Sequence, residues 1–127
     1  MADSVIAKPG VRSGRDERFT AVFYEIRRYT LRPDLREAWV DYFESVIVPF
    51  QRERGMDIVG SFVDAENPDI FVWLRRFDSE DQRKEQYAAV YQDPRWVAEI
   101  APRVGELMLR ELMVVTRVVP TPGSGLV

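Results

Sequence analysis

The feature that most constrains the fold of this sequence is the stretch YEIRRYTLRP at residues 24–33. Its side chains alternate as in a β-strand, where successive residues point to opposite faces of a sheet. We expect one face of this strand to pack against helices, and it carries Val22, Tyr24, Ile26 and Arg28. The other face mixes charged and aromatic groups, and it carries Phe23, Glu25, Arg27, Tyr29 and Leu31. This second face either meets water, as a solvated face with a cross-strand salt bridge, or lines a polar cavity.

Composition places the chain among ordinary globular proteins of one domain. Its 127 residues are 46% hydrophobic and 31% charged, which allows one modest core. The net charge of −3 comes from interspersed acids and bases, so neither a nucleic acid nor a membrane surface is expected as a partner. No apolar run is long enough for a membrane span and no signal-peptide core opens the chain, so we expect a cytoplasmic protein.

The absence of two residue types narrows the possible chemistry. The chain has no cysteine, which excludes disulfides, thiolate nucleophiles and zinc–thiolate sites. It has no histidine either, which excludes a Ser-His-Asp triad and imidazole ligands for haem or zinc. Any catalysis must therefore use carboxylates, tyrosine, arginine, lysine, backbone amides or a bound cofactor. We expect no metal site and no resident cofactor.

Both ends of the chain differ from the middle. Residues 1–18 are small, charged and interrupted by glycine, without apolar periodicity, and we interpret them as a mobile arm. The segment PTPGSGLV at residues 120–127 has the character of a flexible tail. The folded domain is therefore expected at residues 19–119.

A long helix is predicted directly after the first strand. Asp34 and Glu37 have the spacing of a capping box, and Gly55 would end the helix. Its apolar stripe consists of Leu35, Trp39, Phe43, Val46, Ile47 and Phe50. Pro49 cannot donate to the carbonyl of Ser45, so the helix should kink or end near it.

The remainder predicts a hairpin, more helix and a last strand. Strands are expected at residues 56–63, with Gly60 marking a bulge, and at residues 70–77. Ser79 with Gln82 forms a second capping box, and a further helix starts at Asp93-Pro94 and should be interrupted at Pro102. The last strand is expected at residues 112–119.

This order of elements predicts an α+β, ferredoxin-like split βαβ fold. Its four-stranded antiparallel sheet would have both main helices on one side, with the first and third strands as central neighbours. Two sets of residues on neighbouring strands would then lie side by side. The first strand contributes Glu25, Arg27 and Tyr29, and the third strand contributes Phe71, Trp73 and Arg75. Val72 and Leu74 suit the helix side.

An uncovered aromatic face would favour a dimer. The predicted open face carries Phe23, Tyr29, Phe71, Trp73 and Phe77, and exposing that much apolar surface is costly. We therefore expect a homodimer in which two sheets pack face to face into a closed barrel.

Several segments together resemble the NIPSNAP family. They are residues 24–30 (YEIRRYT), 48–50 (VPF), 59–62 (VGSF) and 71–77 (FVWLRRF), followed by Tyr91, Pro94 and Trp96. The resemblance covers nearly the whole domain in the right order. It implies the dimeric α/β-barrel superfamily, whose other branches include cofactor-free monooxygenases, lactone isomerases and haem-degrading proteins. Haem-binding relatives generally present an axial histidine, which this chain lacks, and the third strand lacks the glycine-aromatic signature of RNA-recognition domains.

The first functional hypothesis is a small-molecule site between sheet and helices. Its catalytic candidates are Glu25, Arg27 and Tyr29, and its substrate-binding candidates are Phe71, Trp73 and Arg75. Arg27 or Arg75 would hold a carboxylate, carbonyl or enolate oxygen, and Tyr29 would donate a hydrogen bond. Trp73 would stack an aromatic, polyketide-like ligand, while Glu25 would act as a base only if burial raised its pKa. The reaction would be a cofactor-independent isomerisation, lyase reaction or monooxygenation.

The second hypothesis is a non-catalytic dimeric module that binds a protein or senses a ligand. Under it, Glu25 forms an internal ion pair with Arg27 or Arg75. Trp73 and Tyr29 would then belong to a dimer core, and Tyr87, Tyr91 and Trp96 to the core of the chain. A cavity above about 300 Å³, the lower end for ligand pockets, would favour the first hypothesis.

Overall fold

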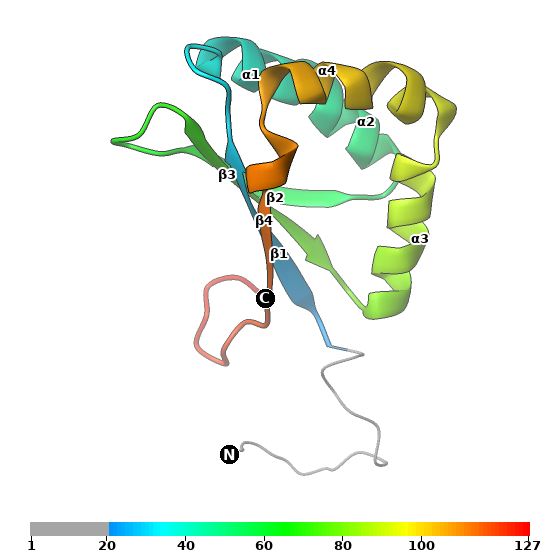
Figure 1. The fold of residues 1–127 in the computed structure, drawn as a ribbon. Coiled ribbons are helices and arrows are strands. Elements are labelled where there is room, and N and C mark those ends of the chain that lie inside the picture. The colour runs from blue at the N-terminus through cyan, green and yellow to red at the C-terminus, as the bar shows by residue number, and fades with distance from the viewer. Residues whose placement is uncertain (1–20) are drawn as a thin grey trace, which may run out of the picture.

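Four antiparallel strands and a layer of helices make up residues 21–127, the part of the chain that this computed structural model describes (Figure 1). The strands are β1 (Phe23–Thr30), β2 (Asp57–Val63), β3 (Ile70–Phe77) and β4 (Val114–Val118). They lie in the order β2-β3-β1-β4, so β1 and β3 are the central neighbours. The predicted α+β, ferredoxin-like fold is thus confirmed. The arm predicted at residues 1–18, and the start of the domain at residue 19, lie outside the described residues.

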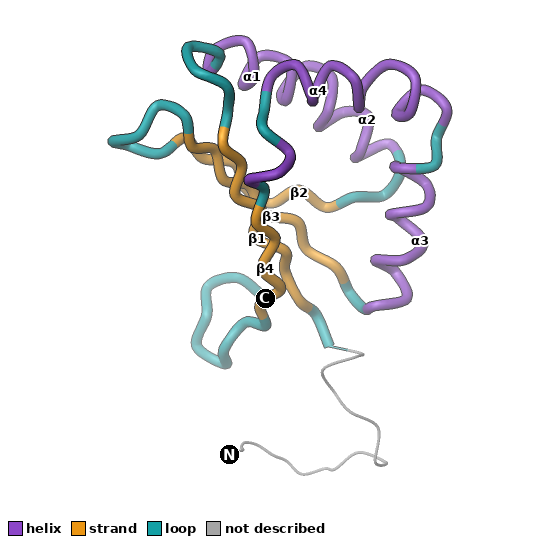
Figure 2. Tube along the Cα trace, viewed as in Figure 1, coloured by secondary structure: helices purple, strands orange, loops and turns teal. Residues whose placement is uncertain are grey.

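Helical segments follow β1 and β3 and cover one face of the sheet (Figure 2). The first group is α1 (Arg36–Tyr42), the π-helical segment η2 (Phe43–Ile47) and α2 (Val48–Glu53). The second group is α3 (Glu80–Tyr91), the π-helical segment η3 (Trp96–Ile100), α4 (Ala101–Leu107) and the short 3₁₀ turn η4 (Arg110–Leu112). Within residues 21–127 no helix combines the length and the apolar character that crossing a membrane requires. The cytoplasmic location stays a prediction.

Most of the predicted helix ends are confirmed. The Ser79 hydroxyl accepts a hydrogen bond from the Gln82 amide at 3.1 Å, and Asp93 Oδ1 accepts one from the Arg95 amide at 2.8 Å. Gly55 follows α2 with φ of 96°, a left-handed conformation that glycine adopts without strain. The predicted cap at Asp34 is wrong, because Asp34 itself takes φ of 65° and Leu35 occupies the cap position without a side-chain bond.

The α-helix is interrupted near Pro49 and Pro102, as predicted, but by a π-helical turn before each proline and not by an end of the helical segment. The Val48 amide donates to the Phe43 carbonyl, and the Ala101 amide donates to the Trp96 carbonyl, both over five residues. Such a wide turn moves the preceding carbonyls away from the proline ring and removes the need for a proline N–H. Each proline then sits in the first turn of the following α-helix, where it is tolerated.

The face of the sheet that meets the helices is the opposite of the one predicted. The core on the helix side includes Phe23, Tyr29 and Leu31 from β1 and Phe71, Trp73 and Phe77 from β3. The ring of Phe43 lies 4.9 Å from Phe71 and 5.1 Å from Trp73, so the chain's own helix covers these aromatics. The predicted reason for a dimer, an uncovered aromatic face, is therefore wrong, while the dimer itself stays a prediction.

The face away from the helices carries aliphatic residues, Arg28 and Arg76, and two large aromatics, the buried Tyr24 and the exposed Phe62. Val72 and Leu74, expected on the helix side, are half-buried there, and Phe62 of β2 is 55% exposed. The predicted bulge in β2 is confirmed by a register shift between Ile58 and Gly60. The C-terminal residues leave β4 on this side (Figure 1), and the Val127 carbonyl accepts hydrogen bonds from Tyr24 at 2.9 Å and Arg76 at 2.8 Å. The flexibility of residues 120–127 stays a prediction.

Candidate functional site

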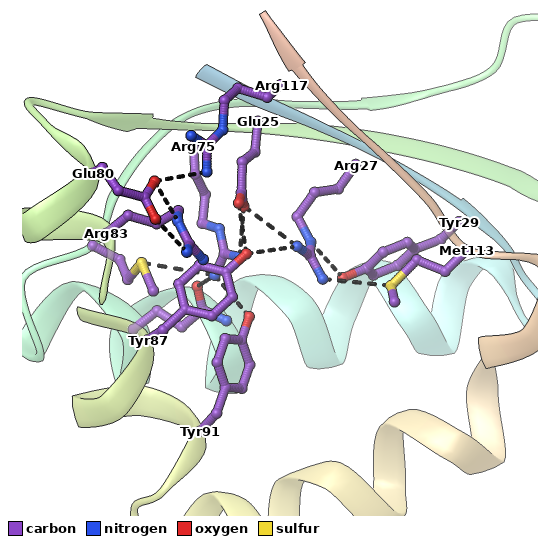
Figure 3. Close-up of polar contacts among 12 residues, drawn as sticks. Glu25, Arg27, Tyr29, Arg75, Glu80, Arg83, Tyr87, Tyr91, Met113 and Arg117 are labelled. Carbon is purple, nitrogen blue, oxygen red and sulfur yellow. Dashed lines mark hydrogen bonds and ion pairs between the residues drawn. The ribbon is translucent and has the colours of Figure 1, made fainter. Parts of the chain in front are cut away.

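Two arginines share one buried carboxylate between the central strands and the helices (Figure 3). Glu25 and Arg27 alternate along β1 on its helix-facing side, and the pairing of β1 with β3 sets Arg75 opposite Glu25. Arg75 Nη2 lies 2.9 Å from Glu25 Oε1, whereas Arg27 Nη1 lies 3.4 Å from the same oxygen. Arg75 is the closer partner of Glu25, and it is fully buried.

Two tyrosines of α3 complete this arrangement. The Tyr87 hydroxyl donates to Glu25 Oε2 at 2.6 Å and lies within hydrogen-bond distance of both arginines. The Tyr91 hydroxyl accepts from Arg75 Nη1 at 2.7 Å. From α2, Gln51 Oε1 accepts from the same nitrogen at 3.0 Å. We call these residues the Glu25 cluster: Glu25, Gln51, Arg27, Arg75, Tyr87 and Tyr91.

Sequence reasoning assigned Tyr87 and Tyr91 to the core and did not single out Gln51. Both tyrosines do pack against the core, but their hydroxyls bond charged groups. Their four-residue spacing puts two phenols on one helical face, and that is the signal that could have found them. Gln51 is buried four residues after Ile47, at a position where an aliphatic residue would continue the apolar stripe.

The surroundings of Glu25 keep its carboxyl ionised. Burial alone raises the pKa of Glu25, but the charge of Arg75, the hydrogen bond from Tyr87 and the charge of Arg27 together lower it below its ordinary value. The condition set for a general base, a raised pKa, is thus not met. Burial raises the pKa of Tyr29, so its phenol stays protonated at neutral pH.

The Glu25 cluster carries an excess of positive charge, and Arg27 has weaker hydrogen-bond acceptors than Arg75. Two guanidinium groups face the single carboxylate of Glu25. Arg75 donates to oxygen acceptors through both terminal nitrogens. Within residues 21–127, Arg27 Nη2 has only the Met113 thioether as acceptor, at 3.4 Å. A thioether is a weak acceptor, so a buried cationic donor remains for another partner.

A cavity of about 510 Å³ opens beside Arg27. Its walls are aromatic and aliphatic, with few polar groups, and the lining residues are Arg27, Tyr29, Trp39, Phe43, Ile47, Gln51, Trp73, Tyr91, Trp96, Val97, Ala101, Pro102, Val104, Met108, Arg110 and Met113. None of these described lining residues is acidic. Val97 is 60% exposed and Met113 38%, which places them toward solvent at the mouth. The two π-helical segments each contribute residues to these walls.

Three of the six predicted site residues reach this cavity. Arg27, Tyr29 and Trp73 line it, while Glu25 and Arg75 stand behind Arg27 in the Glu25 cluster. Phe71 packs in the core against Trp39 and Phe43 instead. The structure therefore brings all six onto one face but divides them into a cavity wall and its support.

Unpaired donors are concentrated in the cavity-lining residues. Among the described residues five buried donors lack a hydrogen-bond partner, and three of them, Trp39 Nε1, Trp73 Nε1 and Gln51 Nε2, belong to residues of the lining. The other two are Arg36 Nε and Arg75 Nε. The Tyr29 hydroxyl accepts from Arg27 Nε at 3.0 Å, which leaves its own proton for another acceptor. An unpaired buried donor costs about 1–3 kcal/mol, so this wall suits a molecule that brings oxygen acceptors.

Comparison with known proteins gives the family of this chain. The NIPSNAP family model matches residues 24–124. The chain belongs to the NIPSNAP family. This result confirms the resemblance found in the sequence. A search of the curated proteins found no match.

Solved structures of other NIPSNAP proteins have the same fold. A NIPSNAP family protein with unknown function from Agrobacterium tumefaciens is 28% identical, with a TM-score of 0.76 over 85% of this chain and 96% of that one. An uncharacterised NIPSNAP-like domain protein from Burkholderia xenovorans is 23% identical, with a TM-score of 0.74 over 83% of this chain and 90% of that one. Because NIPSNAP membership fixes the fold and not the reaction, the function has to be argued from the cavity.

Proposed function

We propose that this NIPSNAP protein binds a small aromatic molecule with carbonyl, carboxylate or enolate oxygens in the cavity beside Arg27. The observation that carries the proposal is a cavity of about 510 Å³ that joins aromatic walls to a buried cation with only a weak acceptor on one nitrogen. This volume lies above the lower end for ligand pockets, about 300 Å³. The aromatic ring of the ligand would pack against Trp73 and Trp96, with its oxygen toward Arg27 and Tyr29.

The same geometry limits the chemistry that such a site would perform. Glu25 stands outside the lining and has a lowered pKa, which makes it a poor base. Its role in our proposal is to position Arg27, together with Tyr87. Arg27 and Tyr29 would stabilise negative charge on a ligand oxygen, as an enolate intermediate of a cofactor-independent isomerase, lyase or monooxygenase requires.

Isothermal titration calorimetry with 1,4-dihydroxy-2-naphthoate tests the binding proposal, with naphthalene as the matched compound without oxygen. We expect the naphthoate to bind at least about tenfold more tightly than naphthalene, the equivalent of one favourable charged contact. Val97→Trp fills the mouth of the cavity from an exposed position and should weaken binding. Val119→Trp, at a half-exposed position outside the lining, is the matched control. Equal affinities in wild type and Val97→Trp would contradict the site.

We also propose that a second copy of the chain covers the open face of the sheet. Two exposed apolar residues on the outer strands favour it: Phe62 of β2 is 55% exposed and Val114 of β4 is 51% exposed. Half-buried aliphatic residues of the central strands lie between them on the same face. Such a dimer would be compatible with ligand binding, because the cavity lies on the other side of the sheet. It also keeps open the non-catalytic role, in which the dimer senses the ligand and transmits its presence to a partner protein.

A further inference from the structure

We infer that the cavity binds a weakly acidic hydroxyl, a phenol or an enol, as its anion, so that the hydroxyl proton is lost to solvent on binding. This inference rests on the proposed function and adds the charge state of the ligand. It follows from two separate features of the wall beside Arg27: its positive charge, and acceptors that already accept hydrogen bonds from arginine side chains.

The charge of the wall favours an anion. Arg27 shares Glu25 with Arg75. The Arg75 Nη2 atom lies 2.9 Å from Glu25 Oε1, whereas Arg27 Nη1 lies 3.4 Å from it, so Arg75 is the closer cation. No described lining residue is acidic, and Arg110 adds a second guanidinium to the lining. A buried charge without a full partner is unfavourable, and a ligand that brings a negative oxygen to Arg27 Nη2 would remove that cost.

The hydrogen-bonding pattern around Arg27 disfavours a neutral hydroxyl. Several elements present polar or titratable groups to Arg27. These groups are Glu25 and Tyr29 from β1, Arg75 from β3, Tyr87 and Tyr91 from α3, and Met113 after η4. Of these, only Glu25 is anionic, and Arg75 and Tyr87 already bond both of its oxygens.

Further along the wall each acceptor already accepts a hydrogen bond from a cation, which makes it a weaker acceptor for a further proton. Gln51 Oε1 accepts from Arg75, and the hydroxyls of Tyr29 and Tyr91 accept from guanidinium groups. An oxygen placed at Arg27 Nη2 would therefore meet donors and the weak Met113 sulfur. The proton of a neutral phenol or enol would be buried without a good acceptor, whereas its anion would accept from every side.

The test uses 4-nitro-1-naphthol, whose anion absorbs visible light. Its absorbance is titrated against pH with and without saturating protein, and we expect the bound compound to ionise at least about one pH unit lower. One unit corresponds to about tenfold tighter binding of the anion than of the neutral form. The matched compound 1-methoxy-4-nitronaphthalene has nearly the same shape but cannot ionise, and it should bind at least about tenfold more weakly at neutral pH.

Variants of neighbouring residues on β1 locate the effect. Arg27→Leu should abolish the shift in ionisation, and Arg28→Leu, an exposed position on the opposite face of the strand, should leave it unchanged. Circular dichroism checks that both variants fold. If Arg27→Leu does not fold, Arg27→Gln and the comparison of the two compounds in the wild-type protein still decide the question.

The outcomes separate this inference from the function on which it rests. A lowered ionisation pH that depends on Arg27 supports the inference. Equal binding of the naphthol and its methoxy analogue without a shift overturns the inference and leaves the cavity as a ligand site. A shift that persists in Arg27→Leu overturns the role of Arg27. If neither compound binds and 1,4-dihydroxy-2-naphthoate fails as well, the proposed function fails together with the inference.

Discussion

Arg75 and Arg27 contact the same carboxylate, yet their removal should have different costs. Arg75→Leu leaves Glu25 with the longer contact to Arg27 and deprives Gln51 and Tyr91 of their donor. We expect a loss of about 3 kcal/mol in the free energy of unfolding, because a buried carboxylate loses its main partner. Arg27→Leu removes a surplus cation and should change the free energy of unfolding by less than about 1 kcal/mol. Urea denaturation measures both.

A double variant provides the control for Arg75. Replacing Glu25 and Arg75 together by leucine removes the pair but leaves Arg27 without its carboxylate, so it should recover only part of the stability lost in Arg75→Leu. Equal losses in Arg27→Leu and Arg75→Leu would contradict the ranking of the two arginines by their distances to Glu25.

A second carboxylate gives the protein a pH dependence in the acid range. Glu80 accepts from Arg83 at 2.7 Å and from Arg117 at 2.8 Å, and these hydrogen bonds, that of Arg83 foremost, lower the pKa of Glu80 from 4.5 to about 2. A carboxyl group whose pKa is lower in the folded than in the unfolded state stabilises the folded protein at pH values above the unfolded-state pKa. This stabilisation is lost as the pH falls through the folded-state pKa. We therefore expect stability to fall between about pH 4.5 and pH 2.

Glu80→Gln should remove part of that dependence. The difference in the free energy of unfolding between wild type and Glu80→Gln should be largest at neutral pH and should shrink toward pH 2. Glu85→Gln is the matched control, since Glu85 lies exposed on the same helix without an ion pair within residues 21–127. A difference that is constant with pH would show that Glu80 acts through packing and not through its charge.

The charged residues of the central strands show where the sequence misleads. Alternation correctly put Glu25, Arg27 and Tyr29 on one face and beside Phe71, Trp73 and Arg75. Charges on that face suggested contact with water, because isolated charges avoid the core. The structure can bury them because Glu25, Arg75 and the phenols of α3 satisfy one another, with Arg27 as the surplus cation. That compensation involves residues about 50–60 positions apart, as in the bonds of Glu25 with Arg75 and Tyr87, and no local pattern reveals it.

Among the elements, α4 offers a prediction at its single glycine. A Cβ at Gly105 would lie 2.5 Å from Arg110 Nη1, so Gly105→Ala requires the exposed Arg110 side chain to move. The far end of a flexible side chain moves at little cost, and alanine favours a helix over glycine by about 0.5–1 kcal/mol. We therefore expect a slightly higher melting temperature by differential scanning calorimetry.

The same substitution should affect the site. Arg110 lines the cavity and donates to the Ala101 carbonyl across the end of α4. Displacing it should change the affinity for 1,4-dihydroxy-2-naphthoate, whereas Gly123→Ala, at a position with open space around it, should not. A lower melting temperature for Gly105→Ala would show that Arg110 cannot yield.

The ends of helices and strands were predictable where a turn or a capping residue marks them in the local sequence. Residues 70–77 form a strand with the predicted bounds, and the Ser79 cap follows directly. The prolines could not be interpreted in the same way, because a missing N–H at Pro49 or Pro102 permits either an end of the helix or a π-helical turn. Packing of the following α-helix against the sheet selects the turn, and that energy is not written in the local sequence.

At the scale of the whole molecule, the reversal of the sheet faces changes the test for a dimer. Phe62→Asp places a charge on the open face and should convert a dimer into a folded monomer, as light scattering with circular dichroism would show. Trp73→Asp should instead unfold the protein, since Trp73 is 1% exposed within its own chain. A monomer in the wild-type protein at micromolar concentration would rule out the proposed dimer.

The cavity was the least predictable feature of the molecule. Its walls come from both helical groups, two strands and the segment after η4, so it exists only once these parts pack together. The sequence placed Arg27, Tyr29 and Trp73 near a possible ligand, but it assigned Trp96 and Tyr91 to plain core. Volume depends on how well side chains fill the space between elements, and residue types alone do not determine it.

The π-helical turns at residues 43–47 and 96–100 also bear on how such a cavity changes between related proteins. A π-helical turn is an α-helix that has gained one residue, so losing one residue there would return the helix to α geometry. Residues beyond that point would keep their orientation, because the wide turn absorbs the extra residue, and only the side chains within the turn would be re-aimed. Phe43, Ile47, Trp96 and Val97 line the cavity within these turns. One-residue insertions and deletions at these two places would therefore let descendants of one ancestor acquire different ligands on an unchanged scaffold.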